Sequence, residues 1–340
     1  MAASFTCVAI TTLPAPPPGW YDIDYAITAS GDLACLRATS DVKAVRRRNW
    51  EAHLAGSTDR PEPYLRPADE GELSLIGPQL PGPAARFALT DPSPGFDTMP
   101  DGGWIFVSRR SEPGRKNAQF LSANGDVTRS FDVGDGIESV QADAGGGAWV
   151  SYFDEGIFGD SLGVAGIAHF DQDGVPTWSA NGGDELPSVN SCYALNAGTD
   201  EAWAYYYSDF PILRVRRDGQ TRFWNNGVTG AKAIAVDGKD VVLFGGYQDQ
   251  TSRIALLRLG ERDAAWTGHL TLDPPSSRWT SVFGRGDSIH IVGDGLWRRF
   301  TVSEIVEAVR AAGDAASPEN SVEPFGETTA YILGRHTDPD

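Results

Sequence analysis

The sequence predicts an all-β protein, a six-bladed β-propeller of four-stranded blades closed by an N-terminal strand and followed by a short C-terminal helix and tail. Three observations carry this prediction. Glycine (39 residues), proline (22) and aromatic residues are spread evenly over the 340 residues, as expected for many short strands joined by turns. Helical periodicity is nearly absent before residue 302. A strand-turn-strand unit recurs six times, at the spacing of one blade.

In each copy of the repeat, a short apolar strand enters a polar Gly/Asp turn, and a second strand leaves it with a large apolar residue. The stretch IESVQADAGGGAWVSY (137–152) is one copy. The second strands are anchored on Leu33, Trp104, Trp149, Trp203, Val242 and Ile289. After a long first step of 71 residues, the steps are 45, 54, 39 and 47 residues, which fit the length of about 40 to 50 residues for one four-stranded blade.

Three further segments predict hairpins. Each places Asn-Gly or Asp-Gly between arms rich in β-forming residues, which is the strongest short-range signal for a two-stranded turn. These segments are 117–131, 166–178 and 212–224. We assign them to the outer hairpins of blades two, three and four.

The two ends of the chain are expected to complete the ring. Residues 4–13 are β-rich and are predicted to close the blade formed by residues 279–301. Residues 302–313 carry an apolar stripe at helical spacing that ends at Gly313. We therefore divide the chain into a propeller (1–301) and a C-terminal helix and tail (302–340) packed on it.

The long first step predicts an insertion at 38–91, in and after blade one. Its stretch DVKAVRRRNWEAHLAG favours an amphipathic helix between strands two and three of that blade. Proline-rich sequence follows this stretch, which is typical of an ordered surface crossing. A cap formed by this insertion over one face of the ring is one interpretation.

Composition restricts the partners. The formal charge of −18 repels nucleic acid and anionic lipid, so we expect neither nucleic acid nor a membrane as partner. The N-terminus lacks a basic region followed by an unbroken apolar run. Three cysteines at unpaired spacings indicate free thiols in a reducing compartment. These features together predict a cytoplasmic protein.

The candidate site follows from the ring. In a propeller the inner strands line the central channel, and the loops that enter them share a face with the connections between second and third strands. Charged and aromatic residues occupy both sets of positions. We expect the ligand-binding residues to be Asp24, Asp97, Glu138, Asp154, Glu155, Cys192, Tyr207, Asp209, Lys232, Tyr247, Arg278 and Trp279.

Carboxylates that converge repel one another unless a cation relieves the repulsion. Lys232 and Arg278 are the candidate partners for the carboxylates of this ring. The same residues also fit an alternative interpretation, an ion-pair network that binds no ligand.

The pattern DAGGGAWVSYFDEG…GIAHFDQDG (143–174) resembles the repeat of bacterial six- and seven-bladed propellers such as streptogramin lyases, the regulator propellers of sensor proteins and regucalcin-like lactonases. The whole chain also resembles a family of uncharacterised bacterial propeller proteins, from which no function follows. A lyase of the streptogramin type would be expected to place histidines on the site face, where this chain places none of its five. Similarity to the lactonases implies one divalent ion held by Glu, Asn and Asp at the channel mouth.

Two functional hypotheses follow. The first is a cofactor-free module that binds a small polar ligand or a peptide, since mixed charges and aromatic faces satisfy such a ligand together. The second is a metal-dependent hydrolase in which calcium, magnesium, manganese or zinc polarises a carbonyl. Its ligands would be Asp24, Asp97, Glu138 and Asn190. Basic residues in the same ring oppose a cation, and the sequence identifies no catalytic residue.

Overall fold

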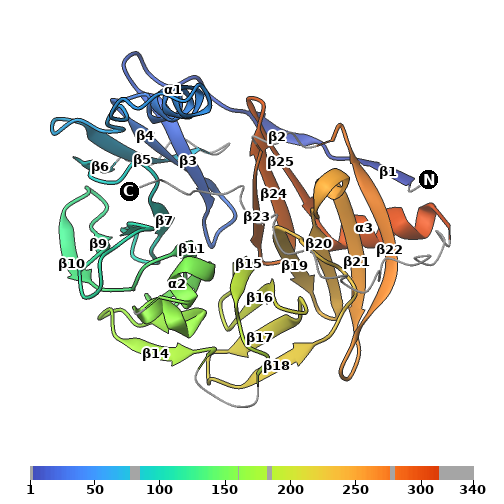
Figure 1. Cartoon of the computed structure of the whole chain (residues 1–340). Helices are drawn as coiled ribbons and strands as arrows, with labels where there is room; N and C mark the ends of the chain where they lie inside the picture. Colours follow the sequence, from blue (N-terminus) through green and yellow to red (C-terminus); the bar gives the residue numbers. More distant parts are fainter. Residues whose placement is uncertain (1–2, 77–84, 160, 182–185, 276–279, 314–340) are drawn as a thin grey trace.

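The computed structural model describes residues 3–76, 85–159, 161–181, 186–275 and 280–313, and these form six β-sheets arranged in a ring (Figure 1). Within each sheet, consecutive strands of the chain pair antiparallel from the inside of the ring outwards. The predicted six-bladed propeller is therefore confirmed. The six predicted anchor residues all lie on the second strands of their blades.

Blades 1 to 4 each consist of four consecutive strands. The strands of each blade are given from the innermost to the outermost. Blade 1 contains β3 (Tyr21–Ile27), β4 (Leu33–Ala38), β5 (Glu70–Ile76) and β6 (Ala85–Ala88), and blade 2 contains β7 (Gly95–Thr98), β8 (Trp104–Val107), β9 (Ala118–Leu121) and β10 (Val127–Phe131). Blade 3 contains β11 (Ile137–Ala142), β12 (Ala148–Tyr152), β13 (Ile167–Phe170) and β14 (Pro176–Ser179), and blade 4 contains β15 (Ser191–Ala197), β16 (Glu201–Tyr207), β17 (Ile212–Arg216) and β18 (Thr221–Trp224). The three predicted outer hairpins are β9–β10, β13–β14 and β17–β18, as expected.

The N-terminus closes the ring with two strands where the sequence predicted one. Blade 5 contains β19 (Ala233–Asp237), β20 (Asp240–Phe244), β21 (Arg253–Leu259) and β22 (Ala264–Asp273), and blade 6 contains β23 (Ser281–Arg285), β24 (Ser288–Gly293) and β25 (Leu296–Thr301). The strand β2 (Ala9–Thr12) pairs antiparallel with β25 and completes blade 6 as predicted. The preceding β1 (Ala3–Thr6) instead pairs parallel with β22 and adds a fifth strand to blade 5. One segment thus joins two blades at their outer edges.

Both predicted helices are present. Helix α1 (Val42–Leu54) lies between β4 and β5, the second and third strands of blade 1, and begins where the Asp41 side chain accepts a hydrogen bond from the Ala44 amide. The strands β5 and β6 fall inside 38–91, so that range holds half of blade 1 as well as the inserted helix. Helix α3 (Val302–Ala311) begins with a capping box between Thr301 and Glu304.

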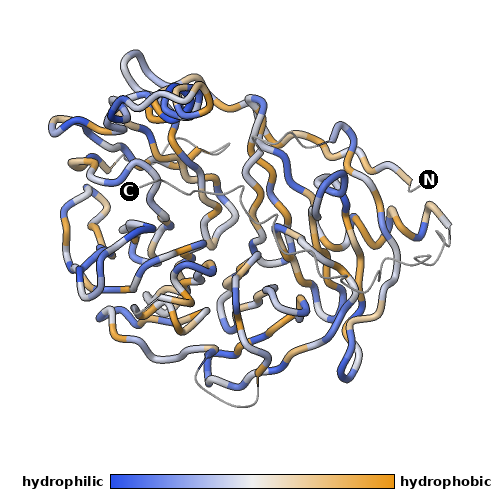
Figure 2. Tube along the Cα trace, in the orientation of Figure 1, coloured by the Kyte–Doolittle hydropathy of each residue, from blue (hydrophilic) through white to orange (hydrophobic). Residues whose placement is uncertain are grey.

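The core lies between neighbouring blades. Buried apolar side chains form clusters that join neighbouring blades, and Figure 2 shows hydrophobic stretches of the trace within the ring. Helix α3 buries Val302, Ile305 and Val309 against blades 5 and 6. The C-terminal tail lies outside the described residues, so its predicted packing on the ring stays a prediction.

Candidate functional site

The predicted site face carries every connection between a second and a third strand. These connections include α1 in blade 1 and α2 (Asp154–Ile157) in blade 3, both labelled in Figure 1. They also include the 3₁₀ turns η1 (Leu162–Ala165) in blade 3 and η2 (Gln248–Gln250) in blade 5. Strand order alone places them together, because strands alternate in direction through each blade. The inner strands enter the channel from the same face.

An aromatic cluster forms at this face where blades 4 and 5 meet. Tyr193 lies at the centre, at the position where the register of β15 against β16 shifts by a bulge. Such bulges re-aim a side chain. Its hydroxyl is 2.7 Å from the Tyr247 hydroxyl, and the Lys232 ammonium nitrogen lies 4.2 Å from the centroid of its ring. We call Tyr193, Tyr207, Phe210, Lys232 and Tyr247 the entrance cluster.

The rings of the entrance cluster meet edge to face. Phe210 is 5.3 Å from Tyr193 at an interplanar angle of 87°, and 5.6 Å from Tyr207. Tyr193 and Tyr247 are 6.2 Å apart at 85°. Edge-to-face contacts are a favourable arrangement of aromatic rings, and the face of such a ring attracts cations, as Lys232 shows at Tyr193. Tyr207 is 36% and Tyr247 40% exposed, so solvent reaches the cluster.

The backbone that presents Phe210 is strained. Asp209 and Phe210 have φ of 59° and 53°, in the left-handed region that residues other than glycine seldom adopt. The Asn226 side-chain amide donates a hydrogen bond of 2.7 Å to the Phe210 carbonyl, and the Phe210 ring stacks on buried Tyr205. Strain of this kind clusters at functional sites and persists only where surrounding structure enforces it.

Tyr247 is held against Gly230. Gly230 has φ +70°, and a Cβ there would come within 2.7 Å of the Tyr247 ring, so only glycine allows this approach. Burial, followed by the hydrogen bond with Tyr193, raises the pKa of Tyr247. The Tyr247 hydroxyl therefore keeps its proton at neutral pH and acts as a donor and acceptor of hydrogen bonds.

The predicted carboxylates lie on the other side of the same face, next to arginines. Asp24 in β3 is 3.9 Å from the Arg109 guanidinium, and Arg109 also donates to the backbone carbonyl of Glu138, the bulge residue of β11. Glu155 forms an ion pair with Arg110, while the neighbouring Asp154 is exposed and accepts a hydrogen bond from the Glu155 amide. The structure thus places Asp24 and Glu155 beside arginines that follow β8, although the sequence grouped them with Lys232 in one ring.

Asp97 occupies a different position from the predicted one. It is 1% exposed, and its carboxylate lies 3.1 Å from the Arg285 guanidinium. The cation that the structure places beside Asp97 is thus Arg285, which the sequence had not suggested. The register explains this position, because Asp97 pairs with Ile105 in the buried half of blade 2.

Arg285 and Asp97 belong to a polar belt that links five inner strands. Gln141 of blade 3 accepts from Arg285 at 2.7 Å and donates to the Leu195 carbonyl of blade 4. Asn196 of blade 4 donates to the Ile234 carbonyl of blade 5 at 2.9 Å. Burial raises the pKa of Asp97, and the charge of Arg285 and the amides of Ala142 and Thr98 oppose that rise. We interpret this belt as structural.

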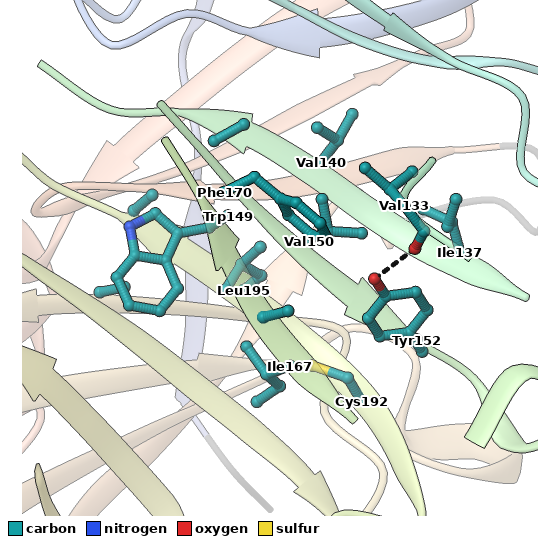
Figure 3. Close-up of a cluster of buried hydrophobic side chains, with 14 of the residues drawn as sticks. Val133, Ile137, Val140, Trp149, Val150, Tyr152, Ile167, Phe170, Cys192 and Leu195 are labelled. Carbon is teal, nitrogen blue, oxygen red and sulfur yellow. Dashed lines mark hydrogen bonds between the residues drawn. The ribbon is translucent and has the colours of Figure 1, made fainter. Parts of the chain in front are cut away.

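Cys192 faces the core and not the channel. Its thiol is 2% exposed in the cluster between blades 3 and 4 (Figure 3), where Tyr152 also donates a hydrogen bond to the Val133 carbonyl. Burial raises the pKa of Cys192 to about 12, so the thiol is protonated at neutral pH and is a poor nucleophile. All three cysteines are free and buried, as the spacings predicted.

The remaining predicted residues have mixed positions. Asn190 donates to the Ser208 hydroxyl at 2.7 Å beside Tyr207, and Asp209 is exposed next to Phe210. Arg278 and Trp279 lie outside the described residues. Within the described part of the chain, no three His, Cys, Asp or Glu side chains are grouped so that they could hold a metal ion. Of the four residues predicted for a metal, Asp24 lies near Arg109, Asp97 pairs with Arg285 and Asn190 donates to Ser208. For Glu138, the contact with Arg109 is through the backbone carbonyl.

A hydroxyl, an imidazole and a carboxylate meet away from this face. The Asp143 carboxylate, in the turn between β11 and β12, lies 2.6 Å from the Nε2 atom of His169, whose Nδ1 atom is 2.6 Å from the Thr177 hydroxyl. The amides of Gly145 and Gly147 donate to Asp143. The glycine run AGGG therefore forms a turn held by the Asp143 carboxylate. The hydrogen bonds between Asp143 and His169 and between His169 and Thr177 connect this turn, which follows the first strand of blade 3, with the third and fourth strands.

We expect Asp143→Asn to destabilise the protein by about 1–2 kcal/mol at pH 7, because a charge-assisted hydrogen bond is lost. Burial acts to raise the pKa of Asp143, but the hydrogen bonds from His169 and the glycines outweigh it and lower that pKa. A lowered folded-state pKa contributes stability above the unfolded value of about 3.9, and this is lost as pH falls through the folded value. Urea unfolding at pH 7 and pH 3 should show the difference shrinking in acid. A constant difference contradicts this account.

Comparison with known proteins adds a partial family match and similar folds. The YxzG family matches residues 181–256, a segment that contains the whole entrance cluster. The comparison with curated proteins gave no match. None of the helices in the described ranges is long and apolar enough to cross a membrane.

Similar solved structures include a virginiamycin B lyase from Staphylococcus aureus, with 13% identity over 84% of this chain and 82% of the lyase and a TM-score of 0.49. A streptogramin B lyase has 11% identity, a TM-score of 0.49 and coverage of 84% and 81%. A gluconolactonase from Xanthomonas campestris has 12% identity, a TM-score of 0.43 and coverage of 86% and 98%. The six-bladed architecture is shown by the sheets of this chain itself, and no activity is transferred from these structures.

Sequence reasoning missed Tyr193 and Phe210. The repeat aligned Cys192 with the channel, but a bulge at Tyr193 shifts the alternation of β15, and a one-residue shift exchanges the two faces of a strand. Phe210 follows the end of β16 in a loop whose conformation no sequence pattern specifies. The grouping of aromatic residues in AYYYSDF (204–210) was the available signal.

Proposed function

We propose that the protein binds a small polar ligand, sugar-like or zwitterionic, at the entrance cluster, and that it acts as a binding module without turnover. The observation that supports this most is the contact of Tyr193 with both the Tyr247 hydroxyl and the Lys232 ammonium, on a face where Tyr207 and Tyr247 remain solvent-accessible. It combines aromatic faces, hydroxyl groups and one positive charge within a few ångströms.

The chemistry of these groups suits such a ligand. Lys232 and the tyrosine hydroxyls donate hydrogen bonds to ligand oxygens, while the ring faces contact C–H groups or an ammonium. The strained loop at Asp209 and Phe210 and the close approach at Gly230 fix the rings before a ligand arrives. Such preorganisation lowers the entropic cost of binding.

Thermal unfolding tests the proposal. The purified protein is scanned with glucose, galactose, glutamate, betaine and succinate as probes, because a ligand that binds only the native state raises Tm. At tenfold its Kd, a ligand adds about 1.4 kcal/mol. We expect at least one probe to raise Tm, with the rise lost in Lys232→Met and reduced in Tyr247→Phe.

A matched control comes from the same blade. Lys239 lies in the turn between β19 and β20, at the opposite face, and is exposed. Lys239→Met removes the same charge without touching the entrance cluster, so it should keep the full rise in Tm. Absence of any rise across the probes contradicts the proposal, as does a rise that Lys232→Met retains.

A further inference from the structure

Helix α1 presents an apolar and basic surface that the ring does not cover. It buries only Val42 and Val45. In its C-terminal half, Trp50 is 59% exposed and Leu54 68% exposed. An exposed tryptophan on a projecting helix resembles the anchor residues that dominate protein interfaces.

A second apolar surface lies two blades away on the same face. It is formed by the segment that contains α2 and η1, where Phe158 is 71% exposed, Val164 47% and Leu162 39%. The backbone beneath it is packed closely. A Cβ on Gly136 would come within 2.3 Å of the Gly156 nitrogen, and one on Gly163 within 2.6 Å of the Gly156 oxygen. The backbone that supports this apolar surface is therefore closely packed and has little room to move.

The charges of the two surfaces are opposite. Helix α1 contains Lys43, Arg46, Arg47 and Arg48, and in the described part of the chain Arg48 alone among them has an ion-pair partner, Glu62. The α2 surface contains three carboxylates. Asp135 and Glu155 share the single guanidinium of Arg110, and Asp154 is exposed.

Their placement permits a reciprocal contact. Both surfaces are connections between a second and a third strand, in blades 1 and 3, so they flank blade 2 on one face. A twofold axis in the plane of this face, aligned with blade 2, brings blade 1 of each copy over blade 3 of the other. A closed dimer requires such a self-complementary arrangement.

We infer that this face binds a second copy of the chain, with α1 of each protomer packed on the α2 surface of its partner. Trp50 and Leu54 contact Phe158, Leu162 and Val164, and Arg47 lies near Asp154 of the partner subunit. The contact itself is made by residues of blades 1 and 3, and no residue of the entrance cluster takes part in it.

The test is the mass of the full chain in solution, measured by light scattering after gel filtration between about 1 and 200 µM, a span in which weak dimers dissociate. We expect a dimer. Trp50→Ala should weaken it about thirtyfold, as for an interface anchor, and Val127→Ala, at an exposed residue of β10, should leave it unchanged. Trp50 is exposed, so circular dichroism should show an intact fold.

Charge reversal makes the test specific to the proposed pairing. Arg47→Glu and Asp154→Lys should each weaken the dimer about tenfold or more. Mixed together, these two variants should form a heterodimer, because the carboxylate introduced by Arg47→Glu then faces the ammonium introduced by Asp154→Lys, and the second contact stays native. A wild-type monomer at every concentration overturns the proposal. So does a dimer that persists in Trp50→Ala, or a mixture that stays as monomers.

Discussion

Arg285→Met should destabilise the protein by about 3–5 kcal/mol, because it leaves the buried carboxylate of Asp97 without its cation. Both side chains are almost completely buried, at 3% and 1% exposure. Arg285 also donates to Gln141 and to the Ala142 carbonyl, so the substitution breaks contacts between blades 2, 3 and 6 together. Urea unfolding at pH 7 measures the loss.

Acid should rescue this variant. Burial raises the pKa of Asp97, and Arg285→Met removes the charge that opposes that rise. When the folded-state pKa lies above the unfolded value, protonation stabilises the fold fully below the unfolded value, and this contribution is lost as pH rises through the folded value. The deficit of Arg285→Met should therefore shrink between pH 7 and pH 5. Wild-type protein measured at both pH values is the reference.

A second variant separates charge from shape. Asp97→Asn combined with Arg285→Met removes both charges, while the introduced amide oxygen still accepts a hydrogen bond from one of the two backbone amides, of Ala142 and Thr98, that the carboxylate binds. The double variant should recover about 1–2 kcal/mol relative to Arg285→Met, since the two effects are not additive. A double variant less stable than Arg285→Met, or a deficit below about 1 kcal/mol in the single variant, contradicts the role assigned to the pair.

The architecture was predictable because it depends on local patterns that repeat. Asn-Gly and Asp-Gly turns mark hairpins wherever they occur, and large apolar residues such as Trp149 and Trp203 follow each inner turn. The double closure was not predictable. Residues 4–13 form strands that pair with two blades, and β-rich sequence does not specify which edge it joins.

The candidate site was predictable only in part. The face itself follows from the strand order, and Lys232, Tyr207 and Tyr247 were placed on it. Its geometry depends on a bulge at Tyr193 and on positive φ at Phe210, which arise from tertiary packing. The position of Asp97 was not predictable either. A carboxylate on an inner strand can lie at the channel entrance or in a buried polar belt, and the sequence pattern is the same for both.

Gly284→Ala should cost about 3 kcal/mol or more, at the upper end for overpacking. Gly284 lies in β23, where a Cβ would come within 2.0 Å of the Ile234 carbonyl oxygen of blade 5. That oxygen also accepts the amide of Asn196. The added methyl group and the Ile234 carbonyl both belong to the backbone region of inner strands, so this clash is relieved only if blades 5 and 6 move apart. A glycine inside a strand often marks such a close approach of two backbones.

Gly227→Ala is the matched control, since Gly227 has no atom within 4 Å of the added Cβ. We expect its free energy of unfolding to change by no more than about 0.5 kcal/mol. Equal stability of the two variants contradicts the inferred contact. The methyl group added at Gly284 disturbs two interactions of the inner strands. One is the backbone contact with Ile234, and the other is the polar belt, because Gln141 donates a hydrogen bond to the Gly284 carbonyl. Loss of stability there, with the outer strands untouched, indicates that the ring is held together from its centre as well as by its N-terminal closure.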